Sequence, residues 1–230
     1  MIEDLKSDLS KLVNKEKAKF FPRFFKTGEG EYGEGDKFIG VVVPNLRLVA
    51  RKYVLIPLPE LQKLLSDKIH EYRNISLMIL VNKYKKADAA EKKIIVDFYL
   101  KNFKNINNWD LVDTSAPGIT GDYFFDKDKT ILYDFAKSDN LWKKRIAIMS
   151  TFGFIRHKSF SDALNISELL LHDSHDLIHK AVGWMLREIG NRDKKVEVSF
   201  LNKHYKTMPR TMLRYAIEKF PENERKHYLS

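Results

Sequence analysis

An internal repeat constrains the fold of this chain more than any other feature of its sequence. Residues 138–145 (SDNLWKKR) match residues 174–181 (SHDLIHKA) at an offset of 36, and residues 66–69 (SDKI) stand two such periods before the first of these segments. Each unit reads as a helix, a turn and a second helix, and such a unit buries its apolar face only against its neighbours. This period therefore predicts an all-α fold, a HEAT-like helical-repeat solenoid.

The same register places three large side chains in equivalent positions. Arg73 takes the place of Arg145, and the intermediate unit places Trp109 there. Because the second helices of a solenoid line its concave surface, we expect these side chains to form a row on a curved, basic face. No low-complexity linker divides the chain, so we expect a single domain over residues 1–230.

Composition and charge favour a helical protein that binds a polyanion. The chain of 230 residues has only 10 glycines and 7 prolines, too few for the many turns of a sandwich or barrel. Its 41 Lys and Arg exceed its 31 Asp and Glu, which gives a net charge of +10. This charge suggests nucleic acid as the partner, and a merely solvated basic surface is the alternative. Several basic runs, among them residues 143–145 (KKR), would form a phosphate-binding stripe if they converge.

Missing residues and motifs exclude several kinds of chemistry. The chain has no cysteine, which excludes disulfides, a thiolate nucleophile and Cys-ligated metal sites. Its apolar runs are far shorter than the ~20 residues of a membrane span, and it has no signal-peptide pattern. We therefore expect a soluble cytoplasmic protein with no membrane contact.

Three histidines resemble a metal cluster at first sight. His175 and His179 have the i, i+4 spacing of a helix-borne zinc pair, but Asp176 stands where the H-E-x-x-H motif has Glu. His172 precedes the expected helix start and need not share their face. We interpret these residues as polar groups of a helix start, and we expect neither a metal nor another cofactor.

Half of the glycines lie in the short segment from Gly28 to Gly40. Its first residues read G-x-G-x-x-G, the fingerprint of dinucleotide binding. No apolar strand precedes this segment, no βαβ pattern follows it, and Glu29 and Glu31 would repel a pyrophosphate. We expect a flexible surface loop, and a lid beside bound DNA is one hypothesis for its role.

Two tryptophans have polar partners at helical spacing. Trp109 and Asp113 are four residues apart, and Trp184 and Arg187 are three apart, so each pair shares one helix face. Indole faces attract cations and a carboxylate neutralises positive charge, so these residues suit a cationic group. The alternative is that both tryptophans are core residues and that Asp113 only helps to end its helix.

Three segments carry a resemblance to a known family: residues 107–117 (NNWDLVDTSAP), 145–148 (RIAI) and 179–188 (HKAVGWMLRE). Together they resemble the AlkD-like DNA alkylation repair family, which are bacterial DNA glycosylases built from HEAT-like repeats. The resemblance extends from about residue 20 to residue 228. It implies a concave face that holds duplex DNA. It also implies excision of N3- and N7-alkylated purines, such as 3-methyladenine and 7-methylguanine, without a metal or redox cofactor.

The resemblance also implies roles for single residues. Trp109 and Trp184 would line the deoxyribose of the lesion, and Asp113 would be the catalytic carboxylate. Arg145 would contact the DNA backbone, and Arg187 would act in a similar way. The repeat row adds Arg73 and the basic run adds Lys144. The predicted DNA contacts are therefore Arg73, Lys144, Arg145 and Arg187.

The chemistry of alkylated purines agrees with such a site. An alkyl group on N3 or N7 makes the purine cationic and weakens the glycosidic bond, so the enzyme mainly stabilises positive charge on the sugar and positions a water molecule. We therefore expect a monomeric DNA glycosylase of base excision repair. A non-catalytic scaffold for damaged or branched DNA, or a HEAT-like scaffold for proteins, are the alternatives. The segment from Gly28 to Gly40 departs from the better-known family members, which have a shorter aromatic segment there.

Overall fold

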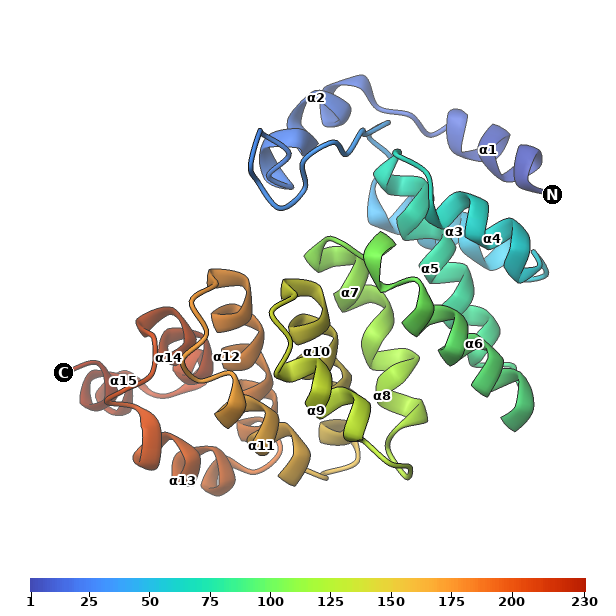
Figure 1. Cartoon of the computed structure of the whole chain (residues 1–230). Helices are drawn as coiled ribbons and strands as arrows, with labels where there is room; N and C mark the ends of the chain where they lie inside the picture. The colour runs from blue at the N-terminus through green and yellow to red at the C-terminus, as the bar shows by residue number, and fades with distance from the viewer. The chain divides into compact units, whose positions relative to one another are not determined.

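Helices account for the regular secondary structure of the chain, so the predicted all-α class is confirmed (Figure 1). The structure is a computed structural model that describes residues 1–230. The one β-type contact is an isolated parallel bridge between Lys37 and Ile69. No helix combines the length and the apolar composition that a membrane span needs.

The chain forms two compact units, residues 1–119 and residues 120–230. The first unit contains α1 (Ile2–Ser10), α2 (Lys15–Phe24), α3 (Val43–Lys52), α4 (Leu58–Leu65), α5 (His70–Tyr84), α6 (Ala89–Lys101), η1 (Phe103–Asn105), α7 (Trp109–Ser115) and η2 (Ala116–Gly118). The second unit contains α8 (Thr120–Tyr123), α9 (Thr130–Ala136), α10 (Leu141–Arg156), α11 (Ser161–Leu169), α12 (Asp176–Gly190), α13 (Lys194–His204), α14 (Arg210–Ala216), η3 (Ile217–Lys219) and α15 (Glu222–Leu229). A single domain over residues 1–230, and the solenoid with its basic concave face, stay predictions.

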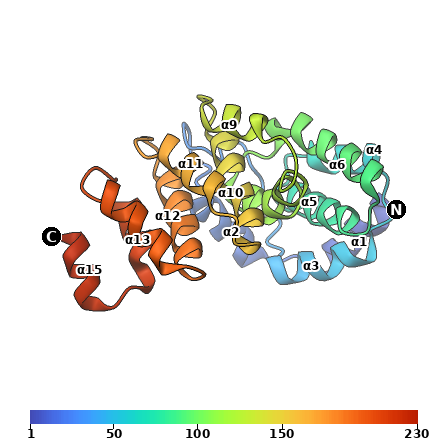
Figure 2. The same ribbon diagram turned by 90° about the horizontal axis from the view of Figure 1, so that it is seen from below.

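Long helices with neighbours on several sides form the middle of each unit. Helix α5 packs against α3, α4, α6 and α7, and α10 packs against α8, α9, α11 and α12. Figures 1 and 2 show α10 and α12 side by side. Because neighbours cover α5 and α10 on several sides, both are buried along most of their length, including polar residues such as Asn74 and Ser150.

The helices that carry the sequence motifs begin at side-chain caps. Asn108 accepts a hydrogen bond from the N–H of Trp109 at the start of α7, and Asn140 accepts from the first N–H groups of α10. At the start of α12, Nδ1 of His175 accepts from the N–H of Leu177 at 3.1 Å. The interpretation of His175 as a polar residue of a helix start is therefore confirmed.

Two glycines allow α8 and α10 to approach closely. A Cβ atom at Gly153 would lie 2.6 Å from the carbonyl carbon of Gly121, and a Cβ at Gly121 would lie 2.4 Å from the carbonyl oxygen of Ser150. The hydroxyls of Thr120 and Ser150 are hydrogen-bonded at 2.6 Å in the same contact. A backbone atom cannot move aside as a side-chain end can, so only glycine fits here.

We expect Gly153→Ala to destabilise the protein by about 1–3 kcal/mol, because the added methyl group overpacks a backbone contact. Urea unfolding followed by circular dichroism measures this change. Gly118→Ala is the control, since its Cβ would meet only Cγ1 of Val81, at an ordinary 3.5 Å. Equal unfolding midpoints for Gly153→Ala and wild type would disprove the close approach.

Candidate active site

Helix α7 presents the two residues that the sequence predicts as a catalytic pair. The helix begins at Trp109, and Asp113 follows one turn later on the same side. Both side chains are partly exposed, whereas Asp110, Leu111 and Val112 between them are buried. The helix is thus anchored through its inner face while the indole and the carboxylate remain accessible.

A stack of aromatic rings supports the indole of Trp109. The ring of Phe25 lies parallel to it, with centroids 5.6 Å apart, and the ring of Phe24 meets it edge-on at 5.7 Å. Phe25 in turn stacks on Phe38 at 5.1 Å and lies 4.7 Å from the ring of His70. The end of α2, the following loop and α5 therefore fix the orientation of this tryptophan.

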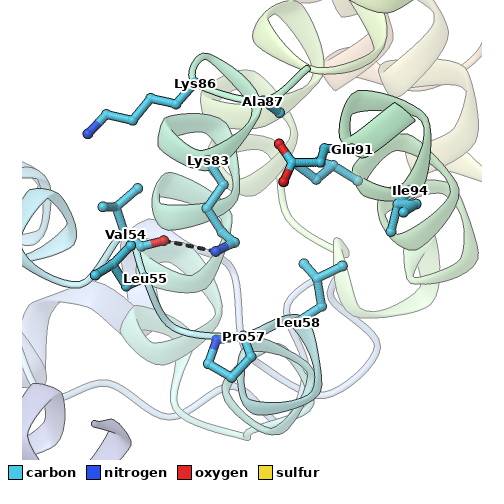
Figure 3. A pocket seen from close by; sticks show the side chains of 10 residues that line it. Val54, Leu55, Pro57, Leu58, Lys83, Lys86, Ala87, Glu91 and Ile94 are labelled. Carbon is cyan, nitrogen blue, oxygen red and sulfur yellow. Dashed lines mark hydrogen bonds between the residues drawn. The ribbon is translucent and has the colours of Figure 1, made fainter. Parts of the chain in front are cut away.

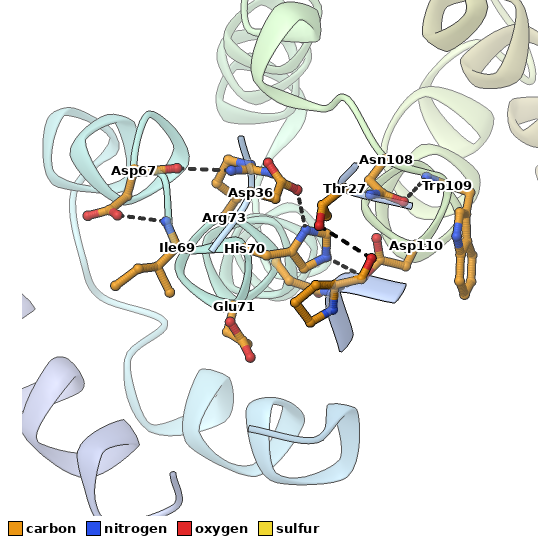
Figure 4. Close-up of polar contacts among 12 residues, drawn as sticks. Thr27, Asp36, Asp67, Ile69, His70, Glu71, Arg73, Asn108, Trp109 and Asp110 are labelled. Atoms are coloured by element: carbon orange, nitrogen blue, oxygen red, sulfur yellow. Dashed lines mark hydrogen bonds and ion pairs between the residues drawn. The ribbon is translucent and has the colours of Figure 1, made fainter. Parts of the chain in front are cut away.

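A buried network of charges joins the first turns of α5 and α7 to the loop before α3 (Figure 4). The side chain of His70 is only 2% exposed. Its Nδ1 lies 2.9 Å from Oδ2 of Asp36, and its Nε2 lies 2.8 Å from Oδ2 of Asp110. Both partners are carboxylates and accept, so both ring nitrogens donate, and the ring is an imidazolium.

The balance of forces on His70 favours its charged form. Burial alone lowers the pKa of His70, but the carboxylates of Asp110 and Asp36 outweigh this effect and raise the pKa from 6.5 to about 9, against the opposing charge of Arg73. Asn74 donates a further hydrogen bond to Asp110 at 2.8 Å. The histidine is therefore charged at neutral pH and compensates the acids on either side.

The segment from Gly28 to Gly40 has two parts. Residues 28–35 form mostly exposed turns, as expected for a surface loop. Residues 36–40 instead dock on α5, where the N–H groups of Ile39 and Gly40 donate to the buried carboxylate of Glu71 at 3.2 and 2.7 Å. Burial raises the pKa of Glu71. The expectation of a flexible surface loop does not describe this second part, because its backbone is hydrogen-bonded to the protein interior.

Two of the predicted DNA contacts have partners inside their own unit. Arg73 is 5% exposed and donates to Oδ2 of Asp36 at 2.6 Å and to the carbonyl of Asp67 at 3.0 Å. Arg145 is 4% exposed, and its Nη1 donates to the carbonyl of Leu177 at 2.6 Å. These contacts give both arginines a role in packing, and DNA contact by them stays a prediction.

The other predicted residues lie in the second unit. Trp184 on α12 is partly exposed, lies 6.1 Å from the ring of Phe152, and donates through Nε1 to Glu188 at 3.2 Å. Arg187 forms an ion pair with Glu218, and Lys144 forms one with Asp173 at 2.7 Å. The structure places Trp109 with Asp113 in one unit and these residues in the other, so a common site stays a prediction.

Sequence reasoning missed the residues that support α7. Asp36, His70 and Asp110 are distant in the sequence, and no spacing rule links a loop carboxylate to a histidine on a later helix. Phe25 did have a signal, since residues 20–25 read FFPRFF and are unusually aromatic for a surface helix end.

Comparison with known proteins identifies the family of this chain. The family described as DNA alkylation repair enzyme matches residues 5–220, so the chain belongs to this family. DNA is therefore its partner, and its role is that of an enzyme in the repair of alkylated DNA.

A solved structure described as a predicted DNA alkylation repair enzyme from Enterococcus faecalis superposes with a TM-score of 0.70 and 14% identity. The match covers 91% of this chain and 97% of that one, and at this identity it shows the fold alone. Comparison with curated proteins gives no match.

We expect the stability of the protein to fall as the pH rises through about 9. The pKa of His70 is about 9 in the folded chain against 6.5 unfolded. The stabilisation is thus complete below pH 6.5 and disappears above the folded value. A difference of this size corresponds to about 3 kcal/mol.

Urea unfolding between about pH 6 and about pH 10 measures this dependence. His70→Gln should flatten the profile in this range, while His157→Gln, an exposed control, should not. Parallel profiles for wild type and His70→Gln would show that the imidazolium is not what holds the network.

Proposed function

We propose that the protein is a monofunctional DNA glycosylase that removes N3- and N7-alkylated purines, such as 3-methyladenine and 7-methylguanine, from duplex DNA in base excision repair. The observation that carries this proposal is the pair on α7: a partly exposed indole and a partly exposed carboxylate one turn apart. Family membership supplies the class of substrate, which is alkylated DNA.

The proposed reaction is hydrolysis of the N-glycosyl bond. The bonding electrons pass to the cationic purine, which leaves as a neutral base, so no acid has to protonate it. Positive charge develops on the deoxyribose, and water adds to C1′ and gives up a proton. The carboxylate of Asp113 stabilises this charge and accepts the proton, and the indole of Trp109 adds a cation–π contact worth about 1 kcal/mol.

The surroundings of α7 support this assignment. A catalytic group works best when the protein holds its geometry before the substrate arrives. The ring of Phe25 and the contact between His70 and Asp110 hold the first turn of α7, which carries Trp109, and Asp113 follows one turn later on the same short helix. Trp184 is proposed as the second aromatic side chain at the deoxyribose.

The remaining parts of the proposal concern DNA contact and location. Arg187 and Lys144 are partly exposed, and we propose that they contact backbone phosphates by exchanging their present carboxylate partners. Arg145 and Arg73 are proposed to order the helices that carry the DNA-binding residues, and their own contact with the DNA backbone stays a prediction. The enzyme is proposed to act as a monomer in the cytoplasm, at the nucleoid, and without a cofactor, because a cationic leaving group needs no metal or redox help.

We expect Asp113→Asn to lower the release of 7-methylguanine from methylated duplex DNA by about a hundredfold or more, because the amide cannot neutralise the charge on the sugar. Binding to the same duplex should remain. Single-turnover release followed by chromatography measures the rate. Asp97→Asn is the control, since Asp97 is an exposed carboxylate on α6 paired only with Lys93.

The two alternatives give different outcomes in the same experiment. Duplex binding without base release by the wild-type protein would support the non-catalytic DNA scaffold. Absence of duplex binding at low salt would support a protein scaffold. Equal release by wild type and Asp113→Asn would refute the assignment of the carboxylate.

A further inference from the structure

A polar hollow of about 360 Å³ lies in the first unit next to the proposed catalytic helix. Arg47 and Arg51 line it from α3, Asn82 and Lys85 from α5 and its C-terminal cap, and Thr114 from α7. Thr114 directly follows Asp113 in the chain. The lining of the hollow therefore includes the residue that follows the proposed catalytic carboxylate in the chain.

The spacing of the residues explains why they converge. Arg47 and Arg51 are four residues apart on α3 and share a face, as do Asn82 and Lys85 at the end of α5. Since α3 and α7 both pack against α5, their side chains meet over its C-terminal turns. The site combines three helices, and no single stretch of sequence contains it.

The cations of this hollow have no acidic partner. Arg47, Arg51 and Lys85 are exposed and form no ion pair, and no Asp or Glu lines the hollow. Their neighbour Lys52, by contrast, pairs with Asp8 at 3.4 Å. Cations that repel one another are held together here without compensation, which is typical of a site that an anion fills.

A second hollow of the same unit has a different character (Figure 3). It measures about 440 Å³ and is lined mainly by apolar side chains, including Leu55, Leu58 and Ile94. Lys83 at its wall already donates to the carbonyl of Val54 at 2.9 Å. Lys86 also lines this second hollow, but so does Glu91, whereas three cations and no acidic residue line the polar hollow beside α7.

We propose that the polar hollow binds a phosphodiester group of the DNA backbone next to the lesion. Two guanidinium groups offer paired N–H donors that match phosphate oxygens, and Lys85 adds a third cation. The hydroxyl of Thr114 and the amide of Asn82 supply neutral donors at the wall. Holding this phosphate fixes the deoxyribose relative to Asp113. The identity of the ligand rests on the proposed function, because that function brings DNA to α7.

The test uses the full chain with Arg47→Gln, Arg51→Gln or Lys85→Gln. Fluorescence anisotropy measures binding to a duplex that contains one 7-methylguanine, over a series of salt concentrations. We expect each variant to lower the affinity about tenfold at low salt. The slope of log K against log salt should fall by about 1. Lys101→Gln is the matched control, because Lys101 is exposed on α6, unpaired, and lines neither hollow.

The outcomes separate this proposal from the proposed function. If the variants match Lys101→Gln in both affinity and salt slope, the phosphate site is refuted, whatever the release assay gives. If the variants lose affinity while the wild type releases no base, the phosphate site stands and the glycosylase proposal falls. Equal urea midpoints for all variants confirm that exposed charges were removed without unfolding.

A second arm distinguishes DNA from a free anion. Inorganic phosphate is titrated against the thermal unfolding of the wild type and of the Arg47→Gln/Arg51→Gln double variant. Stabilisation by phosphate that the double variant loses, together with unchanged duplex affinity, would make this a small-anion site and overturn the assignment to the DNA backbone.

Discussion

The contact of His70 with Asp36 and Asp110 determines how the first unit is assembled. Burying a charge costs several kcal/mol unless a partner and hydrogen bonds compensate it, and here each ring nitrogen faces a carboxylate. The loop contributes Asp36, α7 contributes Asp110, and α5 contributes His70 together with Arg73, so separating these elements would leave buried charges without their partners. Removing a single partner from such a buried group typically costs about 3–5 kcal/mol.

This constraint reaches the proposed catalytic pair through the chain itself. Asp110 follows Trp109 directly, so fixing its carboxylate fixes the first turn of α7. The ring of Phe25 then defines the tilt of the indole from the side of α2. The electrostatic network and the aromatic stack thus hold the same turn, one from inside the unit and one from its surface.

The basic residues that give the chain its net charge of +10 differ in their roles. Arg73 and Arg145 are buried and donate to groups of their own unit. There they take the place of water as hydrogen-bond donors to a carboxylate and to a backbone carbonyl. Arg47 and Arg51 are exposed and unpaired. The two arginines that are equivalent in the repeat are thus both buried donors, whereas Arg47 and Arg51, which lie outside that register, face solvent.

The sequence by itself determined the all-α class, the helical motifs around Trp109 and Trp184, and the family resemblance, because helical periodicity and capping depend on residues close together in the chain. The tertiary structure alone decided that residues 36–40 dock on α5. It also decided that His70 is charged and that cations from α3 and α5 meet beside Thr114. These features depend on residues that lie far apart in the sequence, such as Asp36 and His70, and their burial and distance follow only from packing.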